Sequence, residues 1–330
     1  MTSILTNIAA MAALQTLRSI DRNMEDTQAR VASGLRVQTA EDNAAYWSIA
    51  TTMRSDGSTL ETVQDALGLG AAKVDTAYEA MESAIATVQE IRTKLVAAYG
   101  VGVDRAKIQE EIDQLQEQLR SIAESASFSG ENWLQESISV GAAPSTPKEV
   151  VKNVVASFTR DAEGGVAVTT VDYVLDEKTV LFDLNGGKFG ILDKEATAGS
   201  PADSLGFSVS TIDLKNLTGI ATQLDTLVPP GPHTEEDALD TMVQFVSSQL
   251  EAMTSAASSL GSIQSRIDLQ EDFVASLIDV IDKGIGRLVD ADMNEESTRL
   301  KALQTQQQLG IQSLSIANTN AENILTLFRQ

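Results

Sequence analysis

The sequence has no cysteine, one histidine and only six prolines among its 330 residues. Without cysteine there is no disulfide, no thiol nucleophile and no cysteine-based metal site. The single histidine, His233, follows Pro229-Pro230-Gly231-Pro232, which is typical of a loop, so Ser-His-Asp catalysis is not expected there. No glycine-rich phosphate-binding loop is present either. The sequence therefore predicts no cofactor and no enzyme activity.

Basic residues are also scarce, with 24 Lys and Arg against 47 Asp and Glu and a net charge of −23. Nucleic acids and anionic lipid surfaces are held by clusters of Lys and Arg, and no such cluster occurs here. We therefore expect no nucleic-acid or membrane-surface role. The charge is uneven, since residues 1–43 and 289–330 hold seven basic and ten acidic groups, which leaves −20 on residues 44–288.

Two uncharged stretches could suggest membrane insertion. Residues 1–17 lack the basic region of a secretory signal and contain several polar side chains, so no cleaved signal is expected. Residues 302–321 reach the ~20 residues needed to span a bilayer. They contain seven Gln and Asn side chains, whose burial in lipid is unfavourable. No membrane insertion is predicted.

All six prolines lie between Pro144 and Pro232, which leaves the two flanking segments free to be helical. Apolar residues recur there in heptads, which favours coiled-coil helices rather than one short globular helix. Gly100 and Gly102 end the first run, and Asp104 is the expected N-cap of the next helix. The heptads give each helix an apolar seam, and these seams can be buried only against one another. We therefore expect a helical bundle. Its predicted seam consists of Met53, Leu60, Leu67, Val74, Met81, Val88, Leu95, Ile112, Leu115, Leu260, Ile267, Val274 and Leu277. The intervening positions in the first run are Gly57, Gln64, Ala71, Tyr78, Ile85, Arg92 and Tyr99.

The chain ends carry similar but weaker patterns. The register of the C-terminal run changes between about residues 289 and 299, which predicts a change of partner or axis. Apolar residues such as Leu309, Ile311 and Ile316 also lie off the seam, so one partner helix cannot cover them. We expect other copies of the chain to bury these ends, the alternative being ordinary amphipathic helices packed on their own domain. The predicted assembly residues are Ile4, Ile8, Met11, Leu14, Leu17, Ile20, Leu300, Leu303, Leu314, Ile324 and Phe328.

Between about residues 137 and 235 the pattern changes to period two with β-branched residues. Residues 166–173 alternate, Asn185-Gly186 separates two apolar runs as in a hairpin, and residues 208–214 indicate a further strand. The predicted fold is mainly α, a long coiled-coil helical bundle formed by both chain ends with an inserted small β-rich outer domain. The predicted domains are 1–43 with 289–330, 44–136 with 236–288, and 137–235.

Three short motifs give weaker signals. Residues 290–294 resemble the start of a calcium loop, but Glu295 and Lys301 replace its expected Gly and Glu. Residues 216–218 match the glycosylation sequon, which is frequent by chance. Glu110-Glu111 is better interpreted as a solvated helix face than as an acid/base pair. No metal site is predicted.

Stretches near both chain ends resemble the signatures of bacterial flagellins. Residues 31–37, Val-Ala-Ser-Gly-Leu-Arg-Val, followed by 40–45 and 49–50, are similar to the N-terminal signature. Residues 290–300, 306–307 and 323–327 are similar to the C-terminal one. The resemblance implies a structural protein that is exported unfolded and polymerises into the extracellular flagellar filament for swimming. It also implies an inner tube of paired termini, an outer tube of long helices and a middle segment that projects outward.

The same resemblance implies partners. They are the chain itself, alone or mixed with other flagellins, the flagellar export apparatus and its chaperone, the filament cap, and the hook–filament junction protein. The alternatives are a junction protein, which resembles flagellins at its termini, and a secreted adhesin based on the β insert.

Residues linked by the resemblance to host detection depart from the commoner pattern. In the stretch similar to that read by the animal Toll-like receptor, Gln89 is followed by an acid, Glu90, while Arg92 is retained. The plant-recognised stretch is also altered, at Ala29, Glu41, Asn43, Tyr46 and Trp47. These changes resemble flagellins of plant-associated alphaproteobacteria. We expect weak detection by both receptors, with drift under packing constraints as the alternative origin of the changes.

Overall fold

The computed structural model describes residues 7–100, 102–140, 146–160, 165–197, 204–227 and 232–327. Contacts divide the chain into two compact units. The first contains the described residues of Met1–Thr59 and Ser276–Gln330, and the second is Leu60–Ala275. The first unit therefore joins two segments from opposite ends of the sequence, whereas the second is one continuous stretch. The three-domain division predicted from the sequence stays a prediction.

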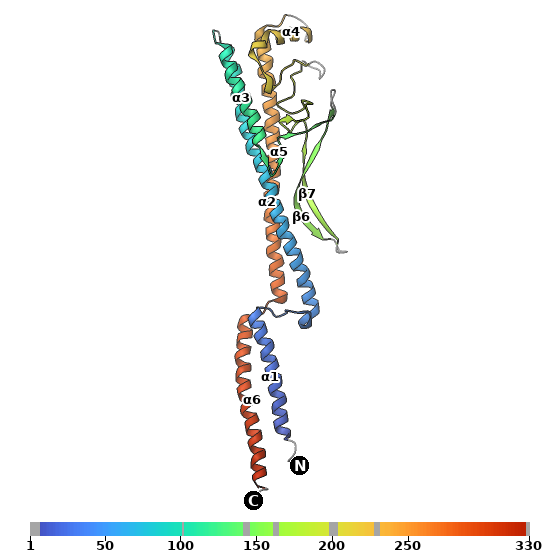
Figure 1. The fold of residues 1–330 in the computed structure, drawn as a ribbon, viewed down its shortest axis with the longest axis vertical. Helices are drawn as coiled ribbons and strands as arrows, with labels where there is room; N and C mark the ends of the chain where they lie inside the picture. Colours follow the sequence, from blue (N-terminus) through green and yellow to red (C-terminus); the bar gives the residue numbers. More distant parts are fainter. Residues whose placement is uncertain are drawn as a thin grey trace. The chain divides into compact units, whose positions relative to one another are not determined.

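In the first unit, helix α1 (Ile8–Ser33) packs along helix α6 (Met293–Leu327), with the two chain ends on the same side (Figure 1). Helix α1 begins where the Asn7 side chain accepts a hydrogen bond from the Ala10 amide. It ends at Gly34, whose φ of 74° lets its amide cap the Arg30 carbonyl. Both ends of α1 are thus specified locally.

A main-chain joint links α1 and α6 to the helices that follow and precede them. The amides of Arg36 and Val37 both donate to the carbonyl of Val289, at 2.6 and 3.2 Å, and the Ala291 amide donates to the Gly34 carbonyl at 2.9 Å. Val37, Ala50 and Val289 form a small apolar cluster beside it. Helix α5 (Glu235–Val289) ends here and α6 begins at Met293, which confirms the predicted change of axis between residues 289 and 299.

The second unit contains most of α2 (Ala40–Ala97), α3 (Arg105–Ser125), α4 (Leu217–Leu227) and the larger part of α5. Asp104 caps α3 by accepting from the Ala106 amide at 3.1 Å, as predicted. Long helices from both halves of the chain flank a smaller segment that contains strands, which confirms the predicted fold class.

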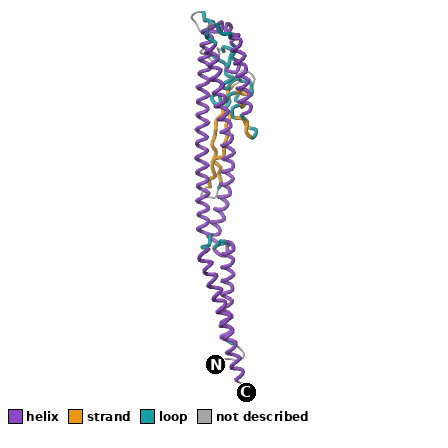
Figure 2. Tube along the Cα trace, turned by 90° about the vertical axis from the view of Figure 1, so that its left-hand side faces the viewer, coloured by secondary structure: helices purple, strands orange, loops and turns teal. Residues whose placement is uncertain are grey.

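Strands occur only between α3 and α4 among the described residues (orange in Figure 2). Strands β6 (Val150–Arg160) and β7 (Val166–Leu175) form one long antiparallel hairpin, which confirms the alternation over residues 166–173. The other strands are two residues long: β1 (Ser127–Phe128), β2 (Glu131–Asn132), β3 (Gln135–Glu136), β4 (Ser139–Val140), β5 (Thr146–Pro147) and β8 (Phe182–Asp183). The insert thus has one substantial sheet.

The predicted hairpin at Asn185-Gly186 was wrong. A turn does form, with Gly186 at φ 77°. However, the Asn185 side chain donates to the Ser139 carbonyl at 2.9 Å, which ties the turn to β4, and β8 pairs with β3 in parallel. The amides of Ile191 and Leu192 donate to the carbonyls of Val180 and Leu181, respectively. The donor and the acceptor thus advance in the same direction along the chain, which is not the antiparallel pattern of a hairpin. The tertiary partner thus overrides the local turn signal.

Residues 208–214 are not a strand, which corrects the second β prediction. They contain two short 3₁₀ helices, η1 (Val209–Thr211) and η2 (Leu214–Asn216). The Ser208 amide donates to the Thr211 hydroxyl, and Asp213 accepts from the Lys215 amide. Ser, Thr and Asp side chains that bond to nearby amides compete with a sheet ladder, which explains the difference. Helix α4 follows directly, so part of the insert is helical.

Candidate assembly surfaces

The paired helices α1 and α6 leave large apolar side chains open. The exposed fraction is 71% for Ile8, 62% for Met11 and 40% for Leu14, and Leu309, Ile311 and Ile316 are more than half exposed. Leu17, Ile20, Leu300 and Leu314 are half-buried, and Leu303 is buried. Ile4 and Phe328, and the side chain of Ile324, lie outside the described residues. Most predicted assembly residues described by the structure therefore retain free apolar surface.

Polar contacts and one close approach help to hold the α1/α6 pair together. Glu296 is buried, and its Oε1 accepts from Arg299 Nη1 at 3.0 Å and lies 3.5 Å from Arg30 Nη1. Farther along, Gln307 donates to Asp21 at 2.8 Å. A Cβ at Gly310 would lie 3.0 Å from Leu17 Cδ1, so the helices approach closely there. These contacts fix the register of the pair without using its exposed apolar residues.

The predicted bundle seam lies mostly inside the two units. Met53, Leu115 and Leu277 are half-buried, and the other ten predicted residues are buried. Of the intervening positions on α2, Gly57 is buried. The later ones were placed one residue too far along, because Gln64, Ala71, Tyr78, Ile85, Arg92 and Tyr99 remain at least partly exposed. The buried positions are instead Val63, Gly70, Ala77, Ala84, Ile91 and Ala98. Four of these are Ala or Gly, whose small side chains give little hydrophobic signal.

Gly70 is the closest contact of α2 with the strands. A Cβ at this position would lie 2.1 Å from Val154 Cγ1 and 3.2 Å from Val154 Cβ. Val154 lies on β6 and is buried. Only glycine lets the β6–β7 hairpin pack at this distance from α2.

The residues placed in the receptor-recognition region by resemblance lie on α2. Gln89 and Glu90 are exposed, and Arg92 is half-buried. The acidic Glu90 side chain therefore faces solvent in the single chain.

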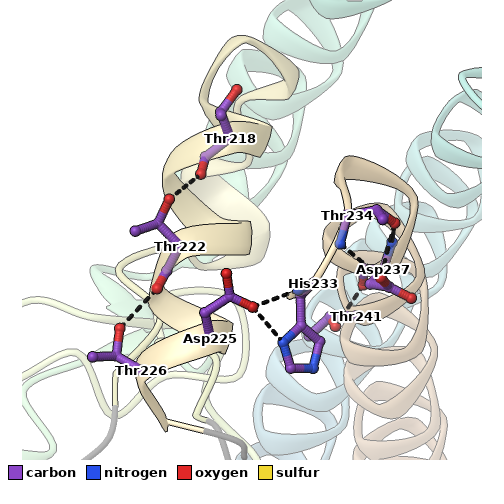
Figure 3. A network of polar contacts seen from close by, with 8 residues as sticks. All are labelled: Thr218, Thr222, Asp225, Thr226, His233, Thr234, Asp237 and Thr241. Carbon is purple, nitrogen blue, oxygen red and sulfur yellow. Dashed lines mark hydrogen bonds and ion pairs between the residues drawn. The ribbon is translucent and has the colours of Figure 1, made fainter. Parts of the chain in front are cut away.

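The single histidine belongs to a capping network between α4 and α5 (Figure 3). The backbone amide and Nδ1 of His233 both contact Asp225 Oδ1, the ring contact at 2.8 Å. Asp237 accepts from the Thr234 amide at 2.7 Å, and the Asp237 amide contacts the Thr234 hydroxyl at 3.3 Å. This reciprocal pair is a capping box at the start of α5. His233 thus takes part in the contacts that link the end of α4 to the start of α5.

This network gives a pH prediction. The pKa of Asp225 is lowered by hydrogen bonds from His233, and that of Asp237 by bonds from Thr234. A lowered folded-state pKa stabilises the fold above the unfolded value of ~3.9, and the contribution is lost as pH falls through the folded value. Hydrogen exchange at the His233 and Thr234 amides should therefore accelerate, beyond its intrinsic pH dependence, as pH falls from about 5 to below 3.

Mass spectrometry of peptides covering residues 225–240 would measure this exchange. The change should be smaller in Asp225→Asn, which cannot titrate, while core amides of α2 serve as the internal reference. An identical pH response in wild type and variant would contradict the prediction.

Sites for metals and membrane-spanning helices were also sought over the described ranges. There, no group of three or more His, Asp or Glu side chains is placed to hold a metal ion. No helix in the same ranges is long and apolar enough to cross a bilayer.

Long helices from both chain halves, paired chain ends and a strand-containing insert define a helical structural protein. The family comparisons give the same result. Residues 4–139 match the bacterial flagellin N-terminal helical region, and residues 243–328 match the bacterial flagellin C-terminal helical region.

Curated relatives match over the full length of both chains. The chain is 56% identical to flagellin C of Rhizobium meliloti (strain 1021) and 52% identical to a flagellin D of Rhizobium meliloti. It is 41% identical to a flagellin of Brucella melitensis, again with complete coverage of both chains.

The chain belongs to the bacterial flagellin family. It is a structural subunit of the bacterial flagellar filament, and it acts in the extracellular filament. The resemblance to flagellins of plant-associated alphaproteobacteria is thereby confirmed.

Proposed function

We propose that α1 and α6 supply the contacts by which copies of this chain polymerise. The observation that carries this proposal is the free apolar surface of the pair, from Ile8 and Met11 on α1 to Leu309, Ile311 and Ile316 on α6. Each such side chain gains ~1.5–3 kcal/mol when it is fully buried. These side chains lie on more than one face of the pair, and exposed apolar surface of this kind marks a site that a partner covers. Other copies of the pair are the partner that a filament subunit meets.

The remaining parts take complementary roles in this proposal. Residues 1–43 with 289–330 form the inner tube, residues 44–136 with 236–288 the outer tube, and residues 137–235 the outer surface. The near-neutral ends support this order, because stacked copies in a narrow tube would otherwise bring like charges together. The family resemblance adds the export apparatus and its chaperone, the filament cap and the junction protein as partners. The role is structural and has no catalytic part.

A pair of neighbouring substitutions tests the α6 surface. Ile316→Asp places a charge in the free apolar surface, whereas Ser315→Asp adds the same charge at an adjacent exposed polar position. We expect Ile316→Asp to reduce seeded polymerisation at least ~10-fold, because a buried unpaired charge costs several kcal/mol. Ser315→Asp should polymerise more nearly as wild type does.

Sedimentation of chain added to sheared filament seeds measures both variants, with circular dichroism to verify that each monomer is folded. Equal polymerisation of Ile316→Asp and wild type would show that this surface is not an assembly contact.

Host detection remains a proposal based on Gln89, Glu90 and Arg92. The exposed acid at Glu90 reverses a charge in the contact patch that the resemblance implies. We expect purified monomer to give a weak response in a reporter assay for the animal receptor, and Glu90→Arg to strengthen it. A strong response to the unmodified chain would contradict this expectation.

A further inference from the structure

Helix α2 begins with an unusual group of exposed apolar residues. Tyr46, Trp47 and Ile49 are 42%, 37% and 50% exposed. Arg54 lies seven residues after Trp47, on nearly the same face of the helix, and is also exposed. In the described part of the chain, no ion pair is formed by Arg54, and the indole N–H of Trp47 has no acceptor. Trp, Tyr and Arg are the residue types enriched in interface hot spots.

A concave surface with complementary chemistry lies in the second unit, between α2 and the end of α3. This groove has a volume of about 520 Å³. Ala80, Ile122 and Ala126 supply its apolar floor, and Asp75 and Glu79 supply carboxylates at its rim. Its size exceeds one indole and leaves room for a neighbouring side chain.

The two carboxylates at the rim differ in their partners. Asp75 accepts a hydrogen bond from Gln264 at 2.6 Å. Glu79 is exposed and forms no ion pair within the described ranges. Glu79 is therefore the carboxylate available to a cation from outside the chain.

We propose that Trp47 of one copy inserts into the α2/α3 groove of a second copy, where Arg54 pairs with Glu79. This proposal rests on the proposed function and adds a contact outside the terminal helices. The groove supplies what the exposed group lacks: an apolar floor for the indole, acceptors for its N–H and a carboxylate for Arg54.

The symmetry of a filament favours this pairing over a contact between two Trp47 groups. A contact between identical surfaces closes a dimer and leaves nothing to continue the chain of copies. A contact between two different surfaces of the same chain can repeat without closing. The aromatic group and the groove are such a pair, since Arg54 lies beside the first and the carboxylate of Glu79 lines the second. A second copy therefore fits the groove better than a free small molecule does.

Charge reversal of the proposed ion pair tests the contact in the full chain. Arg54→Glu and Glu79→Arg should each slow seeded polymerisation several-fold, and the double variant should recover most of the wild-type rate. Trp47→Ala should slow polymerisation ~10-fold or more, as expected for a hot-spot side chain. Val96→Ala is the control, because Val96 is exposed on α2 but lies outside the groove.

Tryptophan fluorescence gives an independent readout. The chain has two tryptophans, of which Trp133 is already buried in the single chain. Polymerisation should therefore shift the emission to shorter wavelength through Trp47. The shift should be absent when Trp47 is replaced by Phe.

Cross-linking separates this proposal from the proposed function, since the natural chain has no cysteine. Chains carrying Arg54→Cys are mixed with chains carrying Glu79→Cys and oxidised, both in filaments and in concentrated unseeded solution. Mixed disulfide dimers should exceed those formed by either variant alone, in solution as well as in filaments. Filaments that contain no mixed dimers would overturn the contact while leaving the filament role intact. The same conclusion would follow if the two charge reversals slowed polymerisation additively in the double variant. Mixed dimers without filaments would support the contact and overturn the proposed role of the termini.

Discussion

Deletion of residues 1–30, or of residues 300–330, is expected to leave a folded, soluble chain that cannot polymerise. Either deletion removes one member of the α1/α6 pair together with its exposed apolar side chains. The core of the second unit lies between Leu60 and Ala275, so neither deletion removes any of its residues. The expected loss is therefore confined to assembly.

Electron microscopy after seeding, together with the helical circular-dichroism signal of the monomer, measures this result. Deletion of a few residues between β6 and β7 is a suitable control, because it shortens the chain away from the termini. Filaments formed by either terminal deletion would show that the termini are not needed for polymerisation.

Substitution of Gly70 is expected to have the largest effect on the stability of the second unit. The added Cβ of Gly70→Ala would overlap the Val154 side chain, so β6 must move away from α2 or Val154 must be displaced. Overpacking of this kind costs ~1–3 kcal/mol of unfolding free energy. The helical propensity gained on replacing Gly by Ala is ~1 kcal/mol, which offsets part of this cost.

The double variant Gly70→Ala with Val154→Ala separates the cost of overpacking from the gain in helical propensity. Removal of the two Val154 methyl groups makes room for the new Cβ, so the double variant should be more stable than the sum of the two single changes predicts. Urea unfolding of the unpolymerised chain measures all four proteins. Gly68→Ala is the control, because a Cβ at Gly68 meets no atom within 4 Å. If the two changes are additive, the contact does not limit the packing of the hairpin.

The sequence predicted the helical part of the fold well because heptad periodicity and helix caps are local signals. Asp104 and the break after Val289 were placed correctly for that reason. The second set of buried positions on α2 was missed, since Gly70, Ala77 and Ala84 carry little apolar area. Their burial depends on how closely a partner approaches, and that distance cannot be deduced from one helix alone.

The β insert was predicted less accurately because its turns are determined by distant partners. The Asn185 side chain donates a hydrogen bond to the carbonyl of Ser139, 46 residues earlier. Strand β8 pairs with β3 rather than with the segment that follows the turn. The groove between α2 and α3 was not predicted at all, since its floor combines residues from two helices.

The joint between Gly34 and Ala291 has a consequence for sequence tolerance. Its three backbone hydrogen bonds do not depend on side-chain identity, apart from the left-handed conformation at Gly34. These bonds connect two chain segments that lie far apart in sequence. We therefore expect the connection to tolerate substitution of the surrounding side chains, other than at Gly34.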